Sequence, residues 1–162
     1  TDQLLKFTGS TTLASSAIST GKVIQTVSAT GGAELMTSST FNSTGLYATI
    51  TPTAATSRLL VFATTPRIYN NGTEELNAQI WKGTSGEASG STVQGLRSDG
   101  GGFSGNTDSP ATMSVLIPAS GVTTAATTFT VMHANGNNSS LVGWYQGLTG
   151  AQGELIIMEI SA

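Results

Sequence analysis

Cysteine is absent from the 162 residues of this chain, and charged side chains make up only 9% of them. The missing thiols exclude disulfides and thiol chemistry, so packing alone, or packing with partner subunits, must hold the fold. Ordinary globular proteins carry about 25% charged residues. The polar surface must therefore come from Ser, Thr, Asn, Gln and Gly, a composition that favours strands joined by many turns.

Positive charge is also scarce, which narrows the possible partners. The six Lys and Arg are scattered, and the formal net charge is −3. Binding to nucleic acid needs clustered cations, and no cluster is present. No apolar stretch approaches the roughly 20 residues of a membrane span. We therefore expect neither nucleic acid nor a membrane as a partner.

Residues that could carry chemistry are few. The single His133 lies in TFTVMHAN without an acidic neighbour in sequence, so we interpret it as a packed or rim residue rather than a base. Asp99 and Asp108 flank a Gly-rich stretch, predicted as a surface loop over 98–109; carboxylates suit Ca²⁺, but this spacing matches no known cage. We predict a protein that is not an enzyme and that holds no cofactor or metal.

Short strands dominate the rest of the chain. Residues 46–52 (LYATITP) alternate apolar and polar side chains, which is the period of a half-buried strand. Asn71 and Gly72 predict a tight hairpin turn, and Pro66 predicts a bend or a sheet edge. Further strands are expected at 22–29, 33–39, 58–69, 74–83, 91–97, 111–118, 127–134, 141–146 and 154–160. About ten strands without a helical period predict an all-β fold, an antiparallel β-sandwich of jelly-roll type over 21–162.

The first 20 residues differ from this pattern. They contain a few apolar residues in a Ser-, Thr- and Ala-rich run, a composition typical of an extended arm. An edge strand or a strap on the chain's own domain is the alternative. If the arm contacts another protein, the contact residues are Leu4, Leu5, Phe7, Leu13 and Ile18.

Two strands are apolar on both faces. Residues 59–63 are apolar throughout, and 154–160 (ELIIMEI) place apolar side chains at both odd and even positions. In a two-sheet sandwich only one face of each strand points inward. The other face must be covered by the arm, a loop or another subunit. The sequence leaves open which face of 59–63 is the inner one. We assign the subunit interface to Leu60, Phe62, Ile156, Met158 and Ile160.

The large aromatic residues allow a second type of contact. Trp144 and Tyr145 could stack on sugar rings at a glycan site, as could Trp81. Core packing is the alternative, because neighbours on a strand face opposite sides. One of Ile80 and Trp81 therefore points inward.

Five segments of the chain resemble a domain of tailed-phage virion proteins that is frequent in phages of cyanobacteria. They are GKVIQTVSA (21–29), TGLYATITPTAATSRLLVFA (44–63), IWKGTS (80–85), DSPAT (108–112) and ELIIMEI (154–160). The resemblance implies a jelly-roll β-sandwich located in the virion, on the capsid surface or in an appendage. Such domains often close long fibres, but this sequence has no coiled-coil heptads and no repetitive stem.

A short arm followed by one sandwich therefore predicts a capsid decoration or cement protein. We expect it to form a homotrimer, with a dimer as the alternative, and to contact the major capsid protein or other virion proteins through the arm. The alternative function is a receptor- or glycan-binding tip of a tail or head fibre. In that case Trp144 and Tyr145 would contact a host-surface glycan.

Overall fold

A computed structural model of the chain describes residues 3–7, 13–17, 21–31, 37–71, 75–83, 90–99, 106–136, 142–144 and 152–162. The strands in these ranges are β1 Gln3–Phe7, β2 Leu13–Ala17, β3 Val23–Gly31, β4 Asn42–Ile50, β5 Arg58–Asn71, β6 Glu75–Gly83, β7 Ser91–Asp99, β8 Asn106–Ile117, β9 Thr127–Asn135, β10 Val142–Trp144 and β11 Gly153–Ile160. A single 3₁₀ turn in the same ranges, η1, spans Ala119–Gly121.

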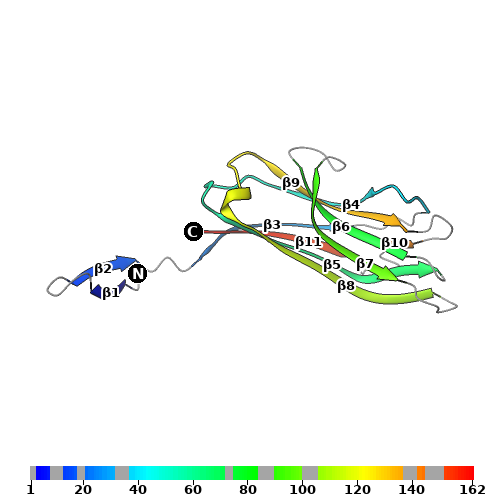
Figure 1. The fold of residues 1–162 in the computed structure, drawn as a ribbon, viewed down its shortest axis with the longest axis horizontal. Helices are drawn as coiled ribbons and strands as arrows, with labels where there is room; N and C mark the ends of the chain where they lie inside the picture. Colours follow the sequence, from blue (N-terminus) through cyan, green and yellow to red (C-terminus); the bar gives the residue numbers. More distant parts are fainter. Residues whose placement is uncertain are drawn as a thin grey trace.

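Strands β3 to β11 form two antiparallel sheets that pack face to face (Figure 1). One sheet has the order β8-β5-β11-β3, and β10 pairs with β5 on the same edge as β11, further along the strand. The other sheet has the order β4-β9-β6-β7. Successive strands from β3 to β6 alternate between the two sheets, as in a jelly roll. The predicted all-β jelly-roll sandwich is confirmed.

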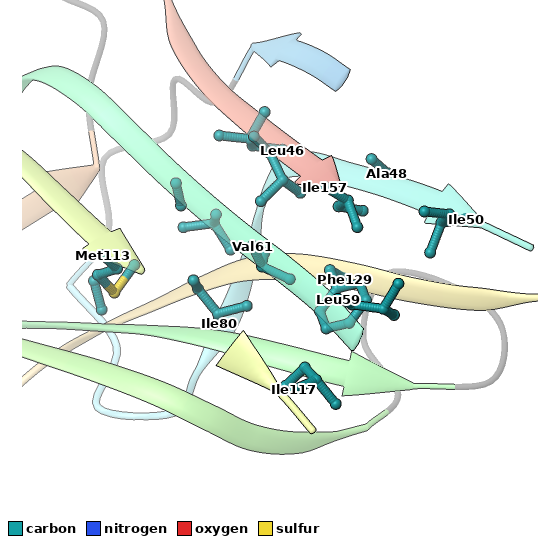
Figure 2. Packing of buried hydrophobic residues seen from close by; sticks show 14 of the residues in the cluster. Leu46, Ala48, Ile50, Leu59, Val61, Ile80, Met113, Ile117, Phe129 and Ile157 are labelled. Atoms are coloured by element: carbon teal, nitrogen blue, oxygen red, sulfur yellow. The ribbon is translucent and has the colours of Figure 1, made fainter. Parts of the chain in front are cut away.

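Alternate side chains from both sheets fill the space between them. Figure 2 shows Leu46, Ile80 and Phe129 of one sheet meeting Leu59 and Ile157 of the other, and all five are fully buried. Each residue lies on a strand whose neighbours in sequence point the opposite way, because side chains alternate across a strand. This core is the main source of stability that the composition allows, since the chain has no disulfides.

Three expectations about the chain path are wrong. Strands β5 and β6 do not form the predicted hairpin across Asn71 and Gly72, because they belong to different sheets. Residues 37–39 of the strand expected at 33–39 lie outside any strand, and 32–36 fall outside the described residues. The loop expected over 98–109 is wrong at both of its ends, because β7 runs to Asp99 and β8 begins at Asn106, and residues 100–105 fall outside the described residues.

Pro66 bends β5 but does not place it at an edge. The β5–β8 register shifts between Thr65 and Ile68, and β5 pairs with strands on both of its sides. Proline has no N–H to donate to a neighbouring strand, so a shift of this kind is where a central strand tolerates it. The Thr65 hydroxyl donates to the Arg67 carbonyl at 2.9 Å across the same irregularity.

The N-terminal residues form a hairpin of their own. Strand β1 pairs with β2 from Gln3 opposite Ala17 to Phe7 opposite Leu13. Neither strand belongs to the two sheets of the sandwich, and Figure 1 draws the hairpin beyond the end where β3 begins. The C-terminus lies at that same end, because Ile160 is opposite Val23. The role of residues 1–20 as a contact arm stays a prediction.

Candidate functional site

The outer face of the β8-β5-β11-β3 sheet carries a band of apolar side chains. Leu59 and Val61 of β5 point into the core, so Leu60 and Phe62 point outward and are half-buried. The same alternation on β11 buries Leu155 and Ile157. Together the outward side chains form what we call the apolar stripe: Leu60, Phe62, Leu116, Ile156, Met158 and Ile160.

Cross-strand pairing makes the stripe continuous. Leu60 lies opposite Leu116 on one side and Met158 on the other, and Phe62 lies opposite Ile156. Leu116 is 48% exposed. Val23, opposite Ile160, extends the stripe onto β3 and is 55% exposed. A contiguous apolar patch of this kind marks an interaction surface more often than single exposed residues do.

The charges near the stripe lie at its two ends. Arg58 is opposite Ile160 at one end of the β5–β11 pair, and Glu154 is opposite Thr64 at the other. Arg58 is exposed and Glu154 is half-buried. The face therefore has one positive and one negative end with neutral residues between them.

Sequence reasoning missed a buried carboxylate at one end of the sandwich. Glu159 has no exposed surface, and it accepts hydrogen bonds from Gln25 Nε2 at 2.7 Å, Thr53 N at 2.9 Å and Thr53 Oγ1 at 2.8 Å. The Ala54 N–H adds a longer bond of 3.3 Å. The carboxylate thus ties the β4–β5 connection to β11 and β3. The position of Glu159 between Met158 and Ile160 in ELIIMEI was the signal in the sequence that could have indicated it. A carboxylate in such an apolar run is buried only if hydrogen-bond partners surround it.

The environment of Glu159 keeps it ionised. Its burial acts to raise the pKa, but hydrogen bonds from Ser57, Gln25 and Thr53 outweigh this effect and lower the pKa to about 2. The group is therefore a structural anion at neutral pH, and the donors around it leave it no exposed surface for reaction.

His133 is a packed core residue, as predicted. It is fully buried on the inner face of β9, opposite Ala78 of β6 and Asn42 of β4. Desolvation by burial lowers its pKa from 6.5 to about 4, so it is neutral at pH 7.

Aromatic residues gather on the outer face of the other sheet. Tyr47 of β4 and Trp81 of β6 both lie opposite Thr130 of β9, so the three share one cross-strand row. Ile80 is the buried member of its pair with Trp81. The Phe41 ring packs against Trp81 with centroids 6.1 Å apart and planes tilted by 44°. We call Tyr47, Thr130 and Trp81 the aromatic row.

The remaining predicted site residues are only partly described. Leu4, Leu5, Phe7 and Leu13 lie on β1 and β2, whereas Ile18 falls outside the described residues. Trp144 is the last residue of β10, and Tyr145 also falls outside. Asp99 ends β7 and Asp108 lies in β8, which belong to different sheets. In the described ranges no three or more His, Cys, Asp or Glu residues come together as a metal site would require.

Comparison with known proteins finds the fold rather than a family. Neither a family model nor a curated protein sequence matches the chain. A solved structure of the VP2 subviral particle of infectious bursal disease virus is similar, with a TM-score of 0.54 and 12% identity over 97% of this chain. The structure of the Gx strain of the same virus matches with a TM-score of 0.36 and 15% identity over 96% of this chain.

The chain spans only 37% and 43% of those two viral chains. None of its described helices is long and apolar enough to cross a membrane. At 12% identity, the likeness to the VP2 subviral particle establishes a common fold and nothing about activity. This chain therefore has a jelly-roll fold similar to one found in the structure of the VP2 subviral particle.

Proposed function

We propose that this protein is a structural component of a virion that self-associates through the apolar stripe and decorates or cements the capsid. The stripe is the observation that carries the proposal. Six apolar side chains run across the strands of one sheet face without burying each other fully. A second copy that covers them removes apolar surface from water, at about 25 cal/mol per Å² before the costs of ordering.

The positions of the charges support a contact between like faces. If two copies pack stripe to stripe with their strands antiparallel, Arg58 of each copy approaches the negative end of the other, at Glu154. Such a contact is isologous and closes as a dimer, whereas a trimer requires the stripe to meet a different surface of the next subunit. The trimer expected from the sequence stays a prediction that the measured mass decides.

Two features support the capsid role. The fold is similar to that of a protein that forms a subviral particle. Among the described strands, β1 and β2 pair only with each other, which leaves them available as the predicted contact arm for the major capsid protein.

Light scattering on the purified protein tests self-association. The 16.4 kDa chain should elute as an oligomer, and Phe62→Ser with Met158→Ser should convert it to a folded monomer. The matched control is Ser114→Ala with Thr26→Ala on the same face, which should leave the mass unchanged. A wild-type monomer at micromolar concentration would refute the interface.

Binding to capsids that lack this protein tests the arm separately. Deletion of residues 1–20 removes the hairpin and leaves every strand of the sandwich. The truncated protein should keep its oligomeric mass and lose capsid binding. Normal binding by the truncated protein would show that the arm is not the contact.

A further inference from the structure

The aromatic row lies on the sheet face opposite to the apolar stripe and has a different chemistry. Tyr47 is 43% exposed, and Trp81 is half-buried. Thr130 lies between them in the cross-strand row and is almost fully buried. The two aromatic positions are two strand spacings apart, about 10 Å. A ligand that contacts both rings must therefore be longer than one sugar ring.

Gln79 places hydrogen-bond donors beside Trp81. The indole Nε1 of Trp81 donates to Gln79 Oε1 at 2.8 Å, and the Thr92 hydroxyl donates to the same oxygen at 2.7 Å. An indole N–H can only donate, so the amide oxygen must face it and the amide nitrogen must face away. Within the described part of the chain, no hydrogen bond involves Gln79 Nε2. Among the described residues, the Gln79 amide therefore offers two N–H donors that point away from the indole.

The described side chains next to the row are neutral. The Thr49 and Thr128 hydroxyls contact each other at 2.8 Å in the next cross-strand row, and Gly83, opposite Thr128, has no side chain to cover it. A charged ligand would find no counter-charge among these residues, whereas a neutral one would find hydroxyls and amides. The Phe41 ring supports Trp81 from one side, which reduces the ordering cost of binding.

We propose that the aromatic row is a binding site for a neutral oligosaccharide. The Tyr47 and Trp81 rings contact the apolar faces of two sugar units, and the Gln79 amide donates to a sugar hydroxyl oxygen. This site is separate from the one expected at Trp144 and Tyr145. It also goes beyond the structural role proposed above and does not depend on it.

Amide-detected NMR titration of the full chain tests the site directly. The probes are neutral hexasaccharides of glucose, mannose and galactose. At least one of them should shift the Trp81 indole signal and the Gln79 side-chain signals, and the shifts should saturate at a sugar concentration of about 10 mM. The same hexasaccharide should bind more tightly than its monosaccharide. Tyr47→Ala should weaken that binding about tenfold, whereas Tyr47→Phe keeps the ring and should bind nearly as wild type.

Two controls separate this site from others. Ser28→Ala changes an exposed residue of β3 in the opposite sheet, outside the apolar stripe, and should leave sugar binding unchanged. A heparin hexasaccharide should not bind. Absence of any shift at Trp81 and Gln79 with all three neutral probes overturns the proposal. Shifts confined to Trp144, or binding that Tyr47→Ala leaves intact, also overturn it. Because no capsid is involved, failure here leaves the structural role untouched.

Discussion

Glu159 shows how one residue organises one end of the sandwich. Its carboxylate accepts hydrogen bonds from Gln25 of β3 and from Thr53 of the β4–β5 connection. That connection runs between the two sheets and is not part of a strand ladder. Ser57, another partner, is itself buried in that connection. The β4–β5 connection, residues 51–57 (TPTAATS), is therefore held in place by the Glu159 carboxylate, to which its neutral residues donate hydrogen bonds.

Glu159→Gln should lower the free energy of unfolding by about 2 kcal/mol or more. The amide keeps one acceptor but turns an N–H₂ group toward N–H donors at Thr53 and Ala54. Urea unfolding measures the loss. Glu154→Gln on the same strand is the matched control, since it lies on the outer face, and its cost should stay below about 0.5 kcal/mol. Equal costs for the two variants would contradict the assigned role.

At the level of the element, the two faces of β5 and the two faces of β11 lie in different environments. Their inner residues fill the core, and their outer residues form the apolar stripe. Residues 59–63 of β5 and 155–158 of β11 are apolar at every position, so both faces of these segments carry apolar side chains. Leu59 and Leu60 are adjacent leucines that point to opposite faces, so the same substitution at each position compares the inner face with the outer face.

Leu59→Ala should cost about 3 kcal/mol of stability, because it leaves a cavity in a closed core. Leu60→Ala should cost less than about 1 kcal/mol in the monomer, since solvent or neighbours can fill the space. It should instead weaken self-association. Urea unfolding of dilute monomer and light scattering at higher concentration measure the two effects. Reversed costs would mean that the two faces are assigned wrongly.

For the whole molecule, pH affects stability through groups at separate places in the sandwich. The folded pKa of His133 is depressed to about 4, so the unfolded chain binds a proton more readily below pH 6.5. The stability that neutral His133 contributes is therefore fully present above pH 6.5, and it is lost as the pH falls from 6.5 toward 4. Glu159 contributes stability above its ordinary pKa of 4.5, and that contribution is lost as pH falls toward about 2.

The window from pH 8 to pH 5 tests His133, because the chain has one histidine. The free energy of unfolding should decrease by about 2 kcal/mol across this range. Urea unfolding at the two pH values measures it, and NMR titration of the His133 ring gives its pKa. A stability that is equal at pH 8 and pH 5 would contradict the burial of a neutral imidazole.

Local chemistry was enough to predict part of this molecule. Alternation in 46–52 indicated a half-buried strand, and the shortage of charge with abundant Ser and Thr indicated an all-β fold. The lone His133 was predicted to be a packed or rim residue rather than a base, and it is packed. These predictions succeed because side-chain period and burial are properties of a strand and its immediate neighbours.

Only the tertiary structure decided which strands meet. Asn71 and Gly72 favour a hairpin, yet β5 and β6 lie in different sheets because the jelly-roll path crosses the sandwich there. Leu59 and Leu60 are equivalent in sequence until one sheet covers one of them. Tyr47 and Trp81 are 34 positions apart, and only pairing with β9 places them in one row. Sheet order and register depend on long-range contacts, so a local pattern determined the strands but not the surfaces that they build.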